Sequence, residues 1–260
     1  MTAPHAQERT RILIADGGLN YLAGLHVAIV GLGGVGGAAA EAIARAGIGR
    51  ITLVDVDRVG LSNMNRQLVC LHSTLGMPKA EVMGLRMRDI NPGAVVSVRT
   101  DFIDPMNVET FLREGQFDYL LDCIDSVACK SHMVANCLRL RIPVISAMGA
   151  GGRLDVRQAC ITTLAKTHTC GLAANMRRRL RRLGASLNYP VVFSGERPIS
   201  PLPQQPIPGH PEAHPRAVNG TISYMPNLFG FMAAGFAVRD LLARSGQLPD
   251  PHNESEKPRR

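Results

Sequence analysis

Apolar runs and helical patterns alternate along the first 150 residues. Five apolar, mostly β-branched runs lie at 26–31, 50–55, 95–103, 119–125 and 143–149. Runs of this kind are typical of strands buried on both faces of a parallel sheet. Segments with helical periodicity separate them, at 35–46, 79–90, 108–113 and 128–140. The alternation predicts an α/β fold with a doubly wound, Rossmann-like, mostly parallel sheet whose ligand lies at the carboxyl ends of the strands.

The pattern changes after Gly152. It predicts a strand and loop over 155–167, and then a basic helix over 171–184 that Gly184 closes. The proline-rich stretch 197–215 predicts an extended loop without regular structure, because proline lacks the backbone donor. A terminal apolar helix follows, and we expect a disordered tail. These features divide the chain into a main region, 1–152, a C-terminal extension of the same domain, 153–245, and the tail, 246–260.

Composition narrows the class of protein. A chain of 260 residues with 45% hydrophobic content can bury one core plus a small appendage. The net charge of +8 favours a polyanionic partner. The longest apolar stretch, 228–243, is shorter than the roughly 20 residues of a membrane span and contains Arg239 and Asp240, so we predict a buried or interface helix. The six cysteines show no CxxC spacing and no signal-peptide pattern precedes the first strand, which favours a cytoplasmic protein without a zinc site.

A glycine-rich turn, GLGGVG, joins the first predicted strand to the first helix of this alternation. Its glycines, Gly31, Gly33, Gly34 and Gly36, allow a backbone to approach phosphate at a helix N-terminus, where free N–H groups favour anions. Asp55 ends the next strand and is placed to accept hydrogen bonds from ribose hydroxyls. The turn alone indicates a nucleotide of either the NAD or the ATP type.

Polar and basic residues after the second strand separate these two nucleotides. In SNMNR, Asn63 and Asn65 offer donors, and the Arg66 guanidinium suits a phosphate through its bidentate geometry. Lys79, which follows Pro78 at a helix start, adds a compact positive charge. Two cations beside a glycine turn suit a triphosphate better than a nicotinamide dinucleotide, so we predict ATP.

One carboxylate is a candidate ligand for Mg²⁺. Asp125 ends the fourth predicted run, where it can hold an ion that bridges the phosphates. Asp122 lies on the same strand and is the alternative. The predicted cofactors are therefore ATP and Mg²⁺.

The motifs GLGGVG, LVDVDRVGLSNMNRQ, GMPKAEV, INP and DCIDS together resemble the ubiquitin-activating-enzyme-like (ThiF/MoeB/HesA) superfamily of ATP-dependent adenylyltransferases. The resemblance is dense from Arg9 to Ser126, and it implies a homodimer in which an N-terminal arginine reaches the partner's site. Arg9 is the best match for that arginine, and Arg11 is the second. The candidate catalytic residues are Arg9, Arg66, Lys79 and Asp125, with Asp125 as the metal ligand. The candidate nucleotide-binding residues are Gly31, Gly33, Gly34, Gly36, Asp55, Asp57, Asn63, Asn65, Arg66, Lys79, Asp125 and Ser126.

The resemblance implies attack of a carboxylate on the α-phosphate of ATP, which gives an acyl adenylate and pyrophosphate. Members that activate sulfur carriers usually have two CxxC pairs for zinc, and this sequence has none. Residues 146–184 and 219–242 instead look like the tRNA threonylcarbamoyladenosine dehydratases, which activate the threonyl carboxylate of a modified adenosine beside the anticodon and cyclise it. The expected partner is then the anticodon region of a tRNA, and not DNA. The alternative is an enzyme that activates the C-terminal glycine of a sulfur-carrier or ubiquitin-like protein. Two weaker hypotheses are a non-catalytic nucleotide-gated adaptor and an NAD oxidoreductase.

Arginines cluster in the predicted basic helix. Such a run is either a solvated helix face or a surface that neutralises RNA phosphates, and the resemblance favours the second interpretation. The low aromatic content, 4% with no Trp, argues against base stacking as the main binding mode. We expect Cys123, Cys137 and Cys160 to be buried, and Cys70 and Cys170 to be more exposed. The candidate tRNA-binding residues are Arg177, Arg178, Arg179, Arg181 and Arg182.

Overall fold

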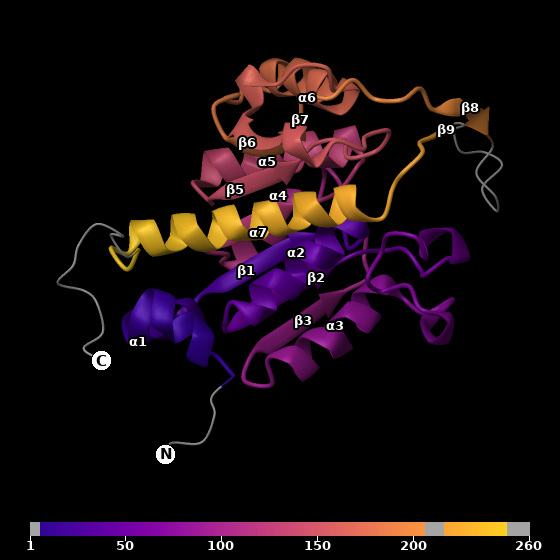
Figure 1. Ribbon diagram of the computed structural model, residues 1–260. Helices are drawn as coiled ribbons and strands as arrows, with labels where there is room; N and C mark the ends of the chain where they lie inside the picture. The colour runs from indigo at the N-terminus through magenta and orange to yellow at the C-terminus, as the bar shows by residue number, and fades with distance from the viewer. Residues whose placement is uncertain (1–5, 206–215, 249–260) are drawn as a thin grey trace.

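The computed structural model describes residues 6–205 and 216–248, and in this part of the chain seven strands form one sheet. Their order is β3-β2-β1-β4-β5-β7-β6, and every neighbouring pair is parallel except β6 and β7 (Figure 1). Chain order reverses between β1 and β4, the kind of position at which open α/β sheets bind ligands. The strands are β1 (His26–Val30), β2 (Arg50–Val54), β3 (Val95–Arg99), β4 (Tyr119–Asp122), β5 (Val144–Ala147), β6 (Ala159–Thr163) and β7 (Pro190–Ser194).

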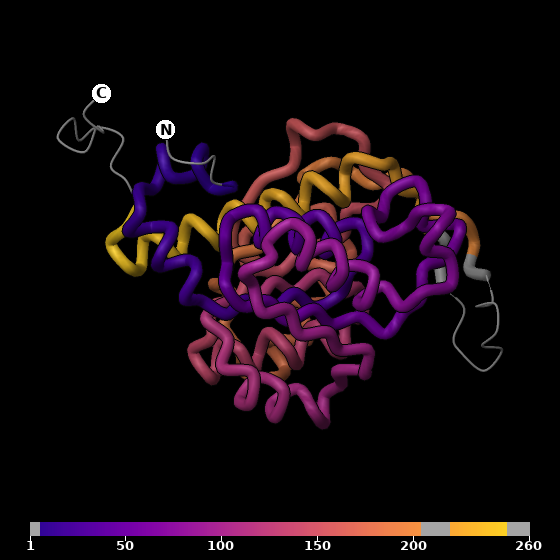
Figure 2. The backbone as a smooth tube through the Cα atoms, turned by 90° about the horizontal axis from the view of Figure 1, so that it is seen from below, coloured from indigo at the N-terminus to yellow at the C-terminus, as the bar shows by residue number. Residues whose placement is uncertain are grey.

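Helices cover both faces of the sheet (Figure 2). Buried residues of α2 (Gly34–Arg45), α3 (Lys79–Ile90) and α7 (Tyr224–Arg244) form one core with the sheet, and the end of α1 (Glu8–Gly24) joins it. Those of α4 (Val108–Gly115), α5 (Val127–Leu140) and α6 (Gly171–Arg182) form the other. Short 3-10 turns lie at Leu61–Asn63, His72–Thr74, Val156–Gln158 and Leu164–Lys166. The sheet therefore has two separate apolar layers, as a doubly wound fold requires.

The terminal helix α7 lies directly against α2. Its buried residues Met225, Phe229, Ala233, Ala237 and Leu241 are four positions apart, which places them on one helix face. Gly230 allows close approach, because a Cβ there would collide with the carbonyl oxygen of Val35 in α2. The prediction of a buried helix at this place is confirmed.

The predicted α/β class and mostly parallel sheet are confirmed, and the strands are shorter than their apolar runs. The fourth run, 119–125, leaves the sheet after Asp122, because residues 123–126 form the connection to α5. The prediction of no regular structure over 197–215 was wrong in part. Leu202–Gln205 (β8) pairs antiparallel with Arg216–Val218 (β9), in a ladder with a register shift between Leu202 and Gln204. Residues 206–215 and 249–260, including most of the predicted tail, lie outside the described residues.

Strands from both sides of Gly152 belong to the same sheet. β7 pairs with β5, and β6 extends the sheet from β7. The carboxyl ends of β1, β2, β4, β5 and β7 open on one side, which we call the carboxyl edge; it includes residues 31–34, 55–66, 123–126 and 148–153.

Candidate functional site

The glycine turn at the end of β1 combines a special backbone conformation with close packing. Gly31 has a φ of 88°, in the left-handed region that favours glycine. A Cβ on Gly36 would collide with the carbonyl of Gly31, and one on Gly34 would lie 2.8 Å from Cβ of Pro226. Gly33 differs, because its nearest neighbour would be Nε2 of Gln67 at 3.6 Å. Gly33 precedes α2, so the open side of the turn coincides with the free N–H groups of that helix.

Asp55 is joined to this turn from the neighbouring strand. Its Oδ2 accepts a hydrogen bond from the backbone N of Leu32 at 2.5 Å, and its Oδ1 accepts one from the backbone N of Asp57 at 2.8 Å. Burial raises the pKa of the Asp55 carboxyl, and the two backbone donors oppose that rise. The carboxylate therefore lies against the glycine turn with its lone pairs partly used by the backbone.

Lys79 and Asp57 form an ion pair beside Asp55. Nζ of Lys79 lies 2.9 Å from Oδ2 of Asp57, and the backbone N of Lys79 donates to the Asp57 carbonyl at 2.9 Å. Pro78 precedes Lys79 and caps α3 in an extended conformation, so the first residue of α3 is held against the loop after β2. The structure thus brings Lys79 to the carboxyl edge, as the sequence predicts.

The SNMNR segment forms a compact loop whose side chains bind one another and the C-terminal region. Arg66 donates through Nη1 to the Ser62 carbonyl and to Oδ1 of Asn65, both at 2.9 Å. Nδ2 of Asn65 donates to the Thr221 carbonyl at 2.8 Å, and Oδ1 of Asn63 accepts from the backbone N of Gly60 at 3.1 Å. Asn65 therefore orients Arg66, and Asn63 shapes the turn.

The two candidate metal ligands have different surroundings. Asp125 is exposed, three residues beyond the end of β4, and Ser126 follows it as the N-cap of α5. Asp122 is fully buried: its Oδ2 accepts from Oγ of Ser146 at 2.6 Å and lies 2.9 Å from Nζ of Lys130. The alternative of Asp122 as a magnesium ligand was therefore wrong, because this carboxylate points into the fold and its charge is already paired.

The residues present would fit a magnesium ion of the kind that accompanies a nucleoside triphosphate. Within residues 6–205 and 216–248 there is no cluster of three or more His, Cys, Asp or Glu side chains able to hold a metal. Magnesium bound with a nucleotide commonly uses one or two protein carboxylates together with phosphates and water. One exposed carboxylate, Asp125, meets that requirement.

The candidate N-terminal arginines lie far from the glycine turn of their own chain. Nε2 of Gln7 donates to the carbonyl of Arg45 at 3.0 Å, so the start of α1 lies at the last turn of α2. The glycine turn is at the other end of this 12-residue helix, roughly 18 Å away at 1.5 Å per residue. Arg9 is exposed, and Arg11 forms an exposed ion pair with Asp16 at 3.7 Å. Figure 1 shows α1 near the end of α2 that is remote from the glycine turn, so neither arginine is brought together with the other candidate residues in the same chain.

The arginines of α6 fall into two groups. Arg177 is half-buried and anchored, because its Nη1 donates to the Thr167 carbonyl at 2.9 Å and to the Thr167 hydroxyl. The other four are exposed, and none of them forms an ion pair with a carboxylate in the described part of the chain; we call them the α6 arginines: Arg178, Arg179, Arg181 and Arg182. The helix begins at the carboxyl edge, since a Cβ on Gly149 would lie 3.5 Å from Sγ of Cys170, the residue before α6.

The cysteine predictions were partly wrong. Cys70 and Cys170 are buried, whereas Cys160 is exposed on β6, the last strand of the sheet. Cys137 is buried as predicted and Cys123 is half-buried. An edge strand exposes side chains that a central strand would cover, and the sequence does not reveal which strand is at the edge.

Four residues that make structural contacts at the carboxyl edge were not foreseen from the sequence. Lys130 and Ser146 hold Asp122, and Nδ2 of Asn227 donates to the Arg66 carbonyl at 3.2 Å. The Glu196 carboxylate accepts from the backbone N atoms of Leu154 and Asp155, the shortest of these bonds at 2.9 Å. Of these four residues, only Lys130 offered a signal in the sequence, because it is a basic residue one turn into the helix that follows the acidic end of β4. Such a pattern is also common on solvated surfaces.

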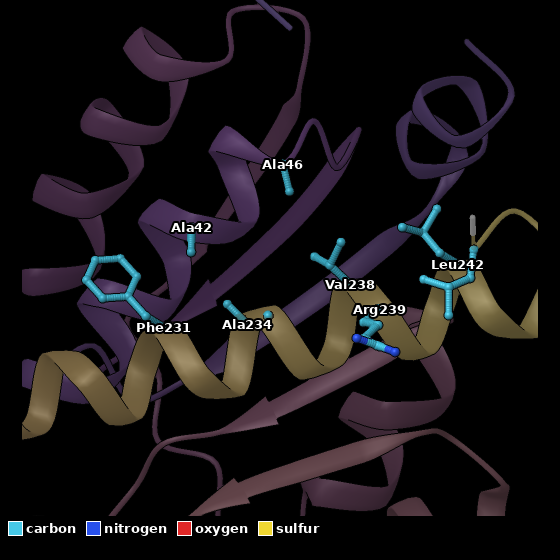
Figure 3. Close-up of a pocket in the computed structure, with 9 residues that line it drawn as sticks. Ala42, Ala46, Phe231, Ala234, Val238, Arg239 and Leu242 are labelled. Atoms are coloured by element: carbon cyan, nitrogen blue, oxygen red, sulfur yellow. The ribbon is translucent and has the colours of Figure 1, made fainter. Parts of the chain in front are cut away.

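An apolar groove lies at the far end of α2, away from the glycine turn (Figure 3). It runs between α2 and α7 and is lined mainly by Ala42, Ala46, Phe231, Val238 and Leu242. Phe231 is about half exposed, and Ile12 and Leu13 of α1 are more exposed than Phe231. None of the helices in residues 6–205 and 216–248 has the length and apolar character that a membrane crossing requires.

Comparison with known proteins gives matches along nearly the whole chain. Residues 7–256 match the ThiF family. The chain is 38% identical over 244 residues to the tRNA threonylcarbamoyladenosine dehydratase of Bacillus subtilis, covering 92% of this chain and 95% of that protein. Among solved structures, it resembles Escherichia coli tRNA N6-threonylcarbamoyladenosine dehydratase, TcdA, in complex with ATP, with a TM-score of 0.81 and 38% identity over 93% of this chain and 95% of that one. The same protein in complex with AMP gives a TM-score of 0.81 and 38% identity, covering 92% and 94% of the two chains. The chain belongs to the ThiF family.

Proposed function

We propose that this protein is an ATP-dependent tRNA dehydratase that adenylates the threonyl carboxylate of threonylcarbamoyladenosine and cyclises it. The observation that carries the proposal is the similarity to tRNA threonylcarbamoyladenosine dehydratases, at 38% identity and over more than nine tenths of both chains, together with the ATP and AMP complexes of the Escherichia coli relative. The arrangement of candidate residues at the carboxyl edge supports it independently.

The proposed reaction has two steps. An oxygen of the carboxylate attacks the α-phosphorus of ATP, and pyrophosphate leaves. A nitrogen of the same modified nucleoside then attacks the acyl carbon, loses its proton, and AMP leaves with the former carboxylate oxygen. The nucleoside therefore loses the elements of one water. Ring closure is intramolecular, and well-oriented reactions of that type have effective molarities of roughly 10⁵–10⁸ M.

We assign the nucleotide to the glycine turn and the loops beside it. The open side of Gly33 and the α2 N-terminus receive phosphate, while Asp55 and Asp57 are available to the ribose side. Lys79 and Arg66 supply positive charge where negative charge develops during phosphoryl transfer. We assign Asp125, with Ser126 beside it, as the group that would hold a magnesium ion, which would neutralise phosphate charge; the exposure of Asp125 supports this assignment.

We assign the tRNA to the surface that leads from the carboxyl edge along α6. This 12-residue helix is about 18 Å long, and its basic residues lie toward its C-terminal end. A nucleoside at the ATP site can therefore be continuous with a stem whose phosphates meet the α6 arginines. Residues 1–152 would supply the ATP site, and residues 153–245 the tRNA and dimer contacts of the same domain. A tRNA substrate also implies that the protein acts in the cytoplasm.

We further propose a homodimer. Arg9 cannot reach the glycine turn of its own chain across roughly 18 Å, so a catalytic role for it requires a second copy. The groove between α2 and α7, together with exposed Ile12 and Leu13, offers apolar surface for that copy near α1 (Figure 3).

Activation of a sulfur-carrier or ubiquitin-like protein is the competing function. It uses the same adenylation step on a C-terminal glycine. The lack of any CxxC pair in the sequence and the exposed α6 arginines favour RNA over a protein tail.

Nucleoside mass spectrometry tests the proposal. Purified protein is incubated with ATP, MgCl₂ and tRNA that carries threonylcarbamoyladenosine, and the tRNA is digested under mild conditions that preserve a labile ring. We expect a nucleoside lighter by one water, release of AMP, and exchange of labelled pyrophosphate into ATP only when this tRNA is present. The matched control is tRNA without the threonylcarbamoyl group. An unchanged nucleoside, together with adenylation of a small carrier protein's C-terminus, would establish the competing function instead.

A further inference from the structure

The buried ion pair of Asp122 and Lys130 lies directly beneath the loop that carries Asp125. Both side chains are fully buried, and Nζ of Lys130 is 2.9 Å from Oδ2 of Asp122. Oγ of Ser146, in the adjacent strand β5, donates to the same carboxylate oxygen at 2.6 Å. The pair therefore connects β4, β5 and the first turns of α5.

Lys130 also binds the backbone of the loop itself. Its Nζ donates to the Asp122 carbonyl at 3.2 Å and to the Ile124 carbonyl at 3.0 Å. An ammonium group has three N–H donors, so these two carbonyls and the carboxylate use all of them. Asp122 is the last residue of β4, and Ile124 lies between β4 and Asp125, where the chain has left the strand ladder. Lys130 thus replaces strand hydrogen bonding in the segment just before the candidate metal ligand.

The same segment touches the glycine turn on its other side. A Cβ on Gly31 would lie 2.9 Å from Cγ2 of Ile124 and 3.0 Å from the carbonyl carbon and oxygen of Cys123. The backbone N of Cys123 donates to the Val30 carbonyl at 2.9 Å, at the end of β1. Because the contact on the turn side is this close, a shift of residues 123–125 changes the distance between Asp125 and the phosphate-binding turn.

Stability alone does not account for this pair. A buried ion pair is often no more stable than apolar side chains of similar volume, because both charges lose their hydration. Apolar side chains cannot, however, bind the Ile124 carbonyl. We propose that Lys130 is a positioning residue: held by Asp122 and Ser146, it fixes the β4–α5 loop so that Asp125 faces the phosphates at the glycine turn. The proposal rests on the proposed function for its consequence in catalysis, and on the loop contacts for its structural part.

A double variant separates positioning from charge pairing. Asp122→Asn with Lys130→Met removes both charges together, leaves an amide oxygen for Ser146, and keeps the apolar stem of the lysine. Lys130→Arg restores a cation with several donors and serves as the conservative variant. The control is Arg86→Met, which removes the ion pair between Arg86 and Glu41 on α3 and α2, 2.6 Å long and remote from this loop.

Two readouts apply to each full-length variant. Hydrogen–deuterium exchange reports the loop, and we expect backbone amides of residues 123–126 to exchange at least tenfold faster in the double variant, with β1 and β5 amides unchanged. Pyrophosphate exchange at varied MgCl₂ reports the site, and we expect a higher magnesium concentration at half-maximal rate and a rate lower by about 10²-fold, the cost of a displacement of about 1 Å. Lys130→Arg should recover most of both, and Arg86→Met should match the wild type.

Each outcome bears on the proposal. If the double variant keeps the native exchange rate in residues 123–126, or keeps the native magnesium requirement despite faster loop exchange, the proposal is wrong. Faster exchange through all strands alike would mean that the double variant destabilises the whole fold. Ser146→Ala, which leaves both charges in place, then tests the loop in a folded protein, where we expect a smaller change of the same kind. Native exchange of residues 123–126 in Ser146→Ala would then overturn the proposal. A wild-type protein without pyrophosphate exchange would refute the proposed function, while the loop exchange still decides the positioning role.

Discussion

Nζ of Lys79 lies 2.9 Å from Oδ2 of Asp57, and the two side chains differ greatly in exposure, at 7% for the lysine and 65% for the aspartate. The lysine side chain is therefore nearly buried, and its charge meets the solvent-exposed aspartate at the carboxyl edge. A cation presented in this way needs little reorganisation when an anionic phosphate arrives, which is the condition for effective electrostatic catalysis.

The first prediction concerns Lys79. Lys79→Met keeps the buried stem and removes the charge, so we expect the protein to remain folded while the adenylation rate falls by about 10²–10³-fold. The measurement is tRNA-dependent exchange of labelled pyrophosphate into ATP, with circular dichroism as the test of folding. Arg58→Met is the matched control, because Arg58 is a nearby cation that donates to the Gly76 carbonyl at 2.8 Å; it should remain active. Wild-type exchange in Lys79→Met would contradict the assignment of this cation to ATP.

The second prediction separates Asp125 from Asp122. Asp125 is exposed, so Asp125→Asn should change the free energy of unfolding by no more than about 0.5 kcal/mol while abolishing magnesium-dependent turnover, since an amide supplies no negative charge to a hard cation. Asp122→Asn leaves the Lys130 charge buried without its partner and should lower the free energy of unfolding by about 3–5 kcal/mol.

Denaturant unfolding and pyrophosphate exchange at several MgCl₂ concentrations measure the two effects on the same samples. Residual ATP binding should persist in Asp125→Asn, because the glycine turn and both cations are intact. The assignment fails if Asp125→Asn turns over normally, or if it is the less stable of the two variants.

The two aspartates show why the site is less predictable from sequence than the fold. The runs that became β1, β2, β4 and β5 are buried on both faces, so their composition alone reveals them, whereas β3 lies at the edge of the sheet and is partly exposed. Asp122 and Asp125 both lie in the fourth run, 119–125, and the difference between them depends on where the chain leaves the ladder. That point is set by Lys130 and Ser146, which come from a helix and a strand later in the sequence.

Long-range contacts also limit the prediction of the other site residues. Asn65 and Arg66 could be chosen from their motif, but their orientation comes from Thr221 and Asn227, more than 150 positions later. Local propensity likewise predicted no strand in the proline-rich stretch, where β8 forms through pairing with β9. The unpredicted orientation and the missed strand have one cause, because in each case the partner that decides the local structure is distant in the chain.

The third prediction tests whether Arg9 acts in a neighbouring subunit. Arg9→Ala and Asp125→Asn should each be inactive alone, and a mixture of the two chains should regain activity, because a hybrid dimer contains one site with both residues intact. Subunit exchange is verified by mass spectrometry of the intact mixed dimer. Since Arg11 is the second match and forms only an exposed pair with Asp16, Arg11→Ala is the matched control and should stay active without mixing. Verified hybrid dimers without activity would exclude a trans role for Arg9.

The last prediction concerns the α6 arginines. Positions 178 and 182 are four residues apart on one helix face, both side chains are exposed, and neither forms an ion pair in the part of the chain that the structure describes. Guanidinium groups in this state can neutralise RNA phosphates and release counterions, so the logarithm of the affinity should fall linearly with the logarithm of the salt concentration. Removing both arginines by Arg178→Ala with Arg182→Ala should lower the magnitude of that slope by roughly one for each lost phosphate contact. Filter binding of tRNA at several KCl concentrations gives the slope.

The control is Arg177→Ala together with Arg45→Ala, because Arg177 is bound to Thr167 and Arg45 to Glu41. This variant should keep the wild-type slope. Equal slopes for all three proteins would mean that α6 is a solvated face, and that the tRNA stem lies against another part of the surface.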